Sequence, residues 1–240
     1  MAKGEQSSLR QRTLAPVRLL LRLWVASLKA IIMHPLMGLS AVFLAGVIFW
    51  GGFHWSLELT NTEQFCISCH EMRNYVYKEY KTTIHYINRT GVRASCPDCH
   101  VPKEWAFKVA RKIRATNELF QWIRGTIDSK EKFEAKRLKL AGYVWKTMEE
   151  TDSRECRNCH EFGNMKVDDQ TPRAFQMHIL GDDWDMTCID CHQGIAHNLP
   201  KGFSKEAQMN VLHDRMEKEK VDCRSCHEGM AGPPAGEGWN

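Results

Sequence analysis

The chain has 240 residues, with 43% hydrophobic and 26% charged side chains, an ordinary composition for one or two domains. Its formal net charge is only +4, and the basic and acidic residues are interleaved after residue 60. This balance indicates a solvated surface and disfavours a nucleic-acid-binding protein. Ten cysteines and eleven histidines are the unusual feature of the composition.

The N-terminal part of the chain is predicted to be a membrane anchor. Residues 35–57 contain no Asp, Glu, Lys or Arg. Because about 20 apolar residues are enough to cross a bilayer core, we expect a single transmembrane helix there. Residues 1–34 form a basic segment, and we expect its part from Leu14 to Met33 to lie as an amphipathic helix on the cytoplasmic surface.

The charges around the apolar stretch predict its orientation. Trp50 and Trp55 mark its far end, where aromatic rings favour the membrane interface. The cations before it place the N-terminus in the cytoplasm and the rest of the chain in the periplasm of a bacterial cell; they are Arg10, Arg12, Arg18, Arg22 and Lys29. A cleaved signal peptide is the alternative, but the stretch is longer than a typical signal core and no clear cleavage site follows it.

Five copies of the pattern Cys-x-x-Cys-His follow the anchor. This pattern attaches haem c, because the two thiols add to the haem vinyl groups and the histidine supplies an imidazole to the iron. Zinc and disulfides are the alternatives, but neither explains a histidine directly after all five pairs. Five haems would also add roughly ten propionate charges and reverse the sign of the net charge. The motifs are Cys66, Cys69 and His70; Cys96, Cys99 and His100; Cys156, Cys159 and His160; Cys188, Cys191 and His192; Cys223, Cys226 and His227.

The spacing of the motifs indicates an internal duplication. The first two motifs start 30 residues apart and the third and fourth 32 residues apart. We therefore predict a tetrahaem periplasmic domain over residues 58–200, with dihaem halves at 62–103 and 152–200 joined by helices at 104–151. Residues 201–240 form a C-terminal extension for a fifth haem. The fold class is mainly α: one N-terminal transmembrane helix and a haem-packed domain with little regular β structure.

The remaining histidines predict the second axial ligands. His85, His178 and His213 lie ten or eleven residues before the first cysteine of a motif, and His197 lies five residues after His192. With the motif histidines they make nine ligands for ten axial positions, so one haem must differ. We predict Met72 as its ligand, which raises the haem potential relative to bis-histidine ligation; ordinary packing is the alternative. Which distal histidine serves which haem stays open, including pairs that cross between the halves.

With these features the chain resembles the NapC/NirT family of membrane-anchored quinol dehydrogenases, and most resembles the branch that serves periplasmic nitrate reductase. The resemblance implies an enzyme of the quinol:cytochrome c oxidoreductase type. Such an enzyme takes electrons from menaquinol or ubiquinol at the outer face of the inner membrane and passes them to a periplasmic reductase, nitrate reductase being favoured. Members of this branch have four haems, so the fifth motif is a departure. The segments that carry the resemblance are CISCHEM (66–72), YKEYKTTIHYINRTGVRASCPDCHVP (77–102), ECRNCHEF (155–162) and CIDCHQGIAHNLP (188–200).

The resemblance also implies a quinol site beside the first haem. In relatives with Met at the place of Met72, that residue ligates the haem, and an acidic residue of the second motif, here Asp98, approaches its open face. Asp98 is thus the candidate general base, with Arg93 and Lys103 as partners of the quinone oxygens. A structural role for Asp98 is the alternative, because Asp190 holds the equivalent place in the second half. Relatives often have His at the position of Lys103, a second departure.

Two other functions compete with quinol oxidation. The chain could relay electrons without a quinol site of its own, or it could itself reduce nitrite or hydroxylamine at an open haem. Ligand counting disfavours the second, because four of the five irons are predicted to be filled. The sequence leaves open the terminal reductase (nitrate, trimethylamine N-oxide, dimethyl sulfoxide or nitrite), the type of quinone, the purpose of the fifth haem and whether the chain forms a homo-oligomer.

Overall fold

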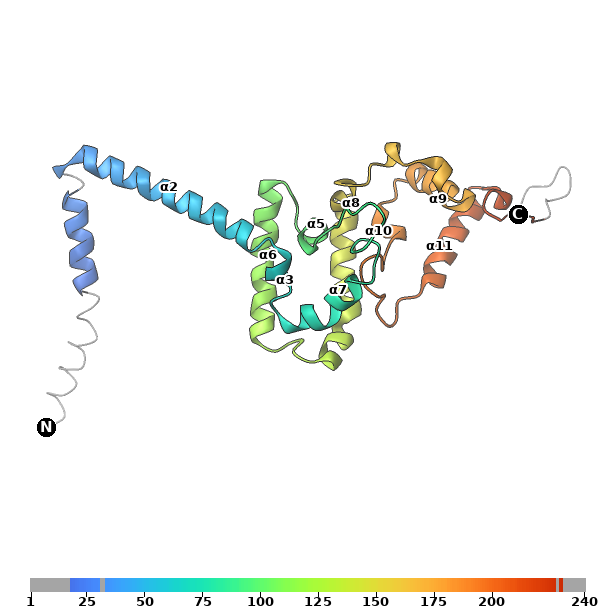
Figure 1. The fold of residues 1–240 in the computed structure, drawn as a ribbon, viewed down its shortest axis with the longest axis horizontal. Coiled ribbons are helices and arrows are strands. Elements are labelled where there is room, and N and C mark those ends of the chain that lie inside the picture. Colours follow the sequence, from blue (N-terminus) through green and yellow to red (C-terminus); the bar gives the residue numbers. More distant parts are fainter. Residues whose placement is uncertain (1–17, 31–32, 228, 231–240) are drawn as a thin grey trace. The chain divides into compact units, whose positions relative to one another are not determined.

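Figure 1 shows the computed structural model, which describes residues 18–30, 33–227 and 229–230. Every regular element in these residues is a helix and none is a strand, which confirms the predicted mainly α fold class. The chain divides into two compact units, Met1–Leu59 and Thr60–Asn240.

The first unit contains the apolar helix α2 (Pro35–Leu59). Most of its side chains are exposed, unlike those of a core helix in a soluble protein, and its length and composition fit a single-pass membrane anchor. Residues 18–30 form another helix, on which Arg18, Arg22 and Lys29 are exposed. Arg10 and Arg12 of the predicted cytoplasmic segment lie outside the described residues.

The second unit begins with four short helices. In α3 (Glu63–Cys66) the Thr62 side chain caps the first turn by accepting a hydrogen bond from the N–H of Phe65 at 3.2 Å. The π-helix η1 (Met72–Val76) and α4 (Tyr77–Tyr80) follow, and α5 (Cys96–His100) starts with a capping box.

Two longer helices occupy the segment between the duplicated halves. They are α6 (Trp105–Ile123) and α7 (Lys130–Glu150). Ser129 caps α7 by accepting a hydrogen bond from the N–H of Lys132 at 3.3 Å. Helix α7 also contacts α10 of the second half, and so connects the two halves.

The second half repeats part of the first. Helix α9 (Pro172–Asp183) begins with Thr171 as its cap and Pro172 at its first position. Helix α10 (Cys188–Cys191) has the capping box of α5, with a threonine in place of the serine. The other elements are α8 (Arg154–Arg157), η2 (Phe162–Asn164), η3 (Val167–Asp169), α11 (Lys205–Lys218) and η4 (Cys223–Ser225).

The apolar core of the second unit is sparse. Its buried hydrophobic side chains are Tyr80, Phe133, Ile189 and Leu212, each from a different helix. Burying a large apolar side chain contributes only about 2 kcal/mol, so four scattered ones are a small driving force for a unit of this size. This scatter fits the prediction that haems fill most of the interior.

Candidate haem centres

The five Cys-x-x-Cys-His motifs lie at short helical turns. In the third, fourth and fifth motifs the histidine N–H donates to the carbonyl oxygen of the first cysteine at 2.9 Å. Residues at positions i, i+3 and i+4 of a helical turn share one face. Both thiols and the imidazole of a motif therefore lie on one side, as attachment of a single haem requires.

No disulfide joins any of the ten cysteines, and none of them is fully buried. They lie within residues 33–227, so the structure describes every one. The two motifs that come first in the chain also touch each other. The side chains of Cys66 and Cys96 are in contact.

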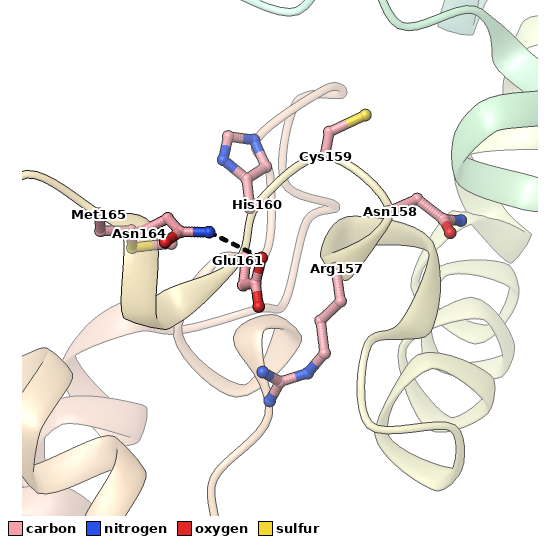
Figure 2. A pocket seen from close by; sticks show the side chains of 7 residues that line it. All are labelled: Arg157, Asn158, Cys159, His160, Glu161, Asn164 and Met165. Atoms are coloured by element: carbon pink, nitrogen blue, oxygen red, sulfur yellow. Dashed lines mark hydrogen bonds between the residues drawn. The ribbon is translucent and has the colours of Figure 1, made fainter.

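A pocket of about 410 Å³ opens at the third motif (Figure 2). This volume lies in the range of about 300–1,000 Å³ that small-molecule and cofactor sites occupy. Figure 2 shows Cys159 and His160 extending to the same side of the loop, while Asn164 Nδ2 donates to Glu161 Oε2 at 2.7 Å. The lining residues are Arg157, Asn158, Cys159, His160, Glu161, Asn164 and Met165.

Eight histidines form four facing pairs, each with one motif histidine and one of the predicted distal histidines. The distances between ring centres are 6.1, 6.3, 6.0 and 6.3 Å. A metal–imidazole bond of about 2 Å, added to the distance from the nitrogen to its ring centre, puts two imidazoles on opposite sides of one metal about 6 Å apart. The spacing thus fits bis-histidine ligation of one iron per pair. The pairs are His85 with His160, His100 with His197, His178 with His192, and His213 with His227.

Two of these pairs cross between the duplicated halves. His85, in the first half, faces the third motif, and His197, in the second half, faces the second motif. The other two pairs are local, because His178 lies on α9 and His213 on α11, each just before the motif that it faces. Each half therefore places one histidine opposite a motif of the other half, an arrangement that the sequence had left open.

Burial keeps several of these imidazoles neutral. It lowers the pKa of His100 to about 4, and the charges of His197 and Arg111 add to the effect. Burial, followed by the charge of His160, also lowers the pKa of His85. A histidine binds a metal through its neutral imidazole, so these environments suit iron ligands.

The first motif differs from the other four. Within the described residues no imidazole faces His70, whose Nε2 lies 3.1 Å from Glu71 Oε1. The Glu71 side chain is buried, and its Oε2 has no hydrogen-bond partner. Met72 is half-buried and opens the π-helix η1, a structure that occurs frequently at functional sites. Ligand counting predicts one site without a second histidine, and His70 is the motif histidine that no other imidazole faces in the part of the chain that the structure describes.

Contacts connect the motifs in chain order. Helix α3 of the first motif contacts α5 of the second, and α5 contacts α8 of the third. Ser153, just before the third motif, accepts a hydrogen bond from the N–H of Ile189 in the fourth at 3.1 Å. Arg173 Nε on α9 donates to the Cys226 carbonyl of the fifth motif at 3.3 Å. The first four motifs are thus joined in chain order, and the fifth is joined to α9, the helix that leads into the fourth motif.

Asp98, the predicted general base, has a structural partner. Its Oδ2 accepts a hydrogen bond from the N–H of Ser95 at 2.8 Å. Asp190 Oδ2 accepts one from the N–H of Thr187 at 2.7 Å in the same way. The two aspartates therefore play the same capping role, which gives the structural alternative for Asp98 a physical basis.

The other two predicted quinol-site residues have different surroundings. Arg93 forms an ion pair with Glu63 and lies 4.2 Å from the ring centre of Tyr86, while Lys103 is exposed. Tyr77 also donates to Glu63 Oε1, at 3.0 Å. No contact among the described residues joins Asp98, Arg93 and Lys103 to one another. No sequence pattern pointed to the cluster around Glu63, because its members lie far apart in the chain.

Comparison with known proteins identifies the family. A model of the NapC/NirT cytochrome c family, N-terminal region, matches residues 29–202, which include the first four motifs and their distal histidines up to His197. The chain belongs to the NapC/NirT cytochrome c family. As a cytochrome of this family it carries covalently bound haem c. The fifth motif lies beyond the matched region.

Individual NapC/NirT relatives are similar over most of their length. A "Denitrification system component NirT" from Stutzerimonas stutzeri is 59% identical over 68% of this chain and 81% of that protein. A "Cytochrome c-type protein NapC" from Paracoccus pantotrophus is 57% identical over 66% of this chain and 67% of that protein. A "Putative tetraheme cytochrome-c type" from Allochromatium vinosum is 44% identical over 69% and 89%. No solved structure matches the chain with significance.

Proposed function

We propose that this chain is a quinol dehydrogenase of the bacterial inner membrane that carries five haem c groups and supplies electrons to a periplasmic reductase. The four facing imidazole pairs, on a chain with a membrane-spanning helix before them, carry this proposal. A haem c group bound at such a site would act as a carrier of one electron. The contacts that join the motifs support a relay along the chain.

The chain's own histidines hold the irons in this proposal. His70 and Met72 serve the first haem, which has one imidazole only. The other assignments, in haem order, are His100 with His197, His160 with His85, His192 with His178, and His227 with His213.

Charged residues support the proposed membrane orientation, and similarity to other family members supports the proposed electron acceptor. Arg18, Arg22 and Lys29 precede α2, which favours a cytoplasmic N-terminus and a periplasmic haem domain. The resemblance to the nitrate reductase branch, and relatives named NapC, favour nitrate reductase as the recipient. On the haem domain, Asp98 is the proposed acceptor of a quinol proton, with Arg93 and Lys103 as partners of the quinone oxygens.

An electron relay without a quinol site is the second candidate. It is favoured by the capping role that Asp98 shares with Asp190, since that role explains the aspartate without a quinol. Such a relay would receive its electrons from another protein.

Reduction by quinol separates the two candidates. The full chain, loaded with haem and placed in lipid nanodiscs, should be reduced by a menaquinol analogue, as followed by haem absorbance. Fully loaded protein that stays oxidised would support the relay. Turnover of nitrite or hydroxylamine with a dye donor would instead identify a reductase. Intact-mass analysis should find five haem adducts, and four would restrict haem to the region that the family model matches.

A further inference from the structure

A buried ion pair holds the loop that carries His197. Arg137 on α7 and Glu79 on α4 lie 58 residues apart, and Arg137 Nη1 donates to Glu79 Oε1 at 2.8 Å. Their side chains are only 10% and 17% exposed. Each also binds the backbone of Asn198: Arg137 Nη2 donates to its carbonyl oxygen at 2.7 Å, and Glu79 Oε2 accepts from its N–H at 2.9 Å. Both polar groups of one residue are thus fixed by the same pair.

The bound residue is the immediate neighbour of His197. That histidine faces His100 at 6.3 Å between ring centres, with an angle of 20° between the ring planes. It lies in the loop between α10, which ends at Cys191, and α11, which begins at Lys205, so it is not part of a helix, although it is hydrogen-bonded to the backbone of Val76. His178 and His213, by contrast, each lie on a helix.

The ion pair is itself firmly placed. The Arg137 guanidinium lies 5.6 Å from the ring centre of the buried Phe133, which stacks on Tyr75 at 5.1 Å. Arg137 Nη1 also donates to Glu134 Oε1 at 3.2 Å. The clamp on Asn198 therefore connects the loop to a packed part of α7.

Energetics point to positioning as the role of the pair. The free energy needed to remove two charges from water offsets much of their mutual attraction. A buried ion pair therefore contributes little to net stability compared with apolar packing. What it can supply is a defined geometry. Histidines that bind metals depend on surrounding hydrogen bonds for their orientation, and loss of such support weakens ligation.

We propose that Glu79 and Arg137 are positioning residues that hold the imidazole of His197 opposite His100. The inference rests on the proposed function, in which these two histidines serve the second haem. Without the clamp the loop moves, and His197 no longer stays within bonding distance of the iron. The haems served by α9 and α11 keep their ligands, because helices hold those histidines.

The test uses the full haem-loaded chain and counts open irons. Glu79→Gln, Arg137→Met and His197→Ala are compared with the unaltered protein by electron paramagnetic resonance and by carbon monoxide binding after reduction. His197→Ala should add one equivalent of bound carbon monoxide per chain. Each clamp variant should add a substantial fraction of one equivalent, and added imidazole should restore the low-spin spectrum. Combining Arg137→Met with His197→Ala should open no more irons than His197→Ala alone.

Two control variants separate positioning from general destabilisation. Lys146→Met removes an exposed ion pair from the same helix α7, and Thr126→Ala removes a half-buried hydrogen bond to the Gln121 carbonyl between α6 and α7. Neither should add open irons. If Thr126→Ala opens irons as the clamp variants do, the effect is only structural and the proposal fails.

The remaining outcomes tell the two claims apart. If His197→Ala opens no iron, the assignment of His197 to the second haem is wrong. If it opens one and the clamp variants open none, the assignment stands and the positioning role is wrong.

Discussion

The imidazoles of His85 and His160 face each other at 6.1 Å with a 76° angle between their planes, although they belong to opposite halves of the duplicated domain. The other three pairs have angles of 20–28°. Low-spin ferric haems with nearly perpendicular imidazoles give a different paramagnetic resonance signal from those with nearly parallel ones, because ligand orientation sets the splitting of the iron d orbitals.

His85→Ala should therefore abolish one distinctive signal. We expect the signal of the perpendicular pair to be replaced by a high-spin signal, because the lost imidazole faces His160 of the third motif. His178→Ala is the matched control and should remove a signal of the parallel type. A perpendicular-type signal that survives in His85→Ala would contradict the crossed pairing.

Met72→Leu should change the first haem alone. A thioether ligand raises the potential of a haem relative to bis-histidine ligation, so its loss should shift the spectrum and the midpoint potential of one haem. Redox titration of the variant and the unaltered chain provides the measurement. An unchanged titration would show that Met72 packs without binding iron.

His213→Ala should open the fifth haem and leave five haem adducts attached. The histidine faces His227 at 6.3 Å and takes no part in thioether attachment, which needs only Cys223 and Cys226. Intact mass and carbon monoxide binding test both expectations together. A fifth haem that stays wholly low-spin would assign its second ligand to another residue, such as Met216 or Met230.

Ser153→Ala should destabilise the haem domain. Ser153 is fully buried, and without its hydroxyl the N–H of Ile189 loses its acceptor. A buried donor without a partner costs about 1–3 kcal/mol, which guanidinium unfolding of the haem-loaded protein should detect. Thr116→Ala, at an exposed hydroxyl on α6, should change the unfolding free energy by less than about 0.5 kcal/mol. Equal effects of the two variants would contradict a role for Ser153.

Glu79→Gln should make the unfolding free energy depend less on pH under acidic conditions. Burial alone would raise the pKa of Glu79, but hydrogen bonds from Arg137 and Asn198, and the charge of Arg137, hold it below its usual value. The stabilisation is therefore complete above the unfolded pKa of about 4.3 and is lost as the pH falls through the folded pKa. Between about pH 6 and pH 3 the unfolding free energy of the unaltered chain should fall more steeply than that of the variant. Parallel curves would show that this carboxyl titrates normally.

The sequence left all the pairings open, and the structure shows why the local pairs and the crossed pairs differ. His178 follows the helix-start signal Thr171-Pro172, and His213 follows Ser204, which caps α11, so each helix leads into its own motif. His85 has almost the same offset from its motif, but it lies in a turn after α4, and its side chain faces the other half. The number of residues between a histidine and the next motif does not decide which motif its side chain faces. That depends on the helix or turn in which the histidine lies.

Long-range contacts are the part that the sequence could not supply. The number of histidines alone predicted that one site lacks a second histidine, because this argument needs no knowledge of the three-dimensional structure. The pair of Glu79 and Arg137 was missed, since a salt bridge between residues 58 positions apart leaves no periodic trace. The same is true of Glu63 and Arg93.

The positions of the two histidines of each site in the chain also determine which motifs can be removed without affecting the others. The second and third motifs each face a histidine from the other half, so separating the halves would remove one facing imidazole from each. The fifth site has both histidines in one short stretch, and hydrogen bonds from Arg173 and Trp184 to Cys226 and Glu219 join that stretch to α9. The fifth motif therefore needs no histidine from the duplicated halves, and its removal would leave the other four motifs with the histidines that now face them.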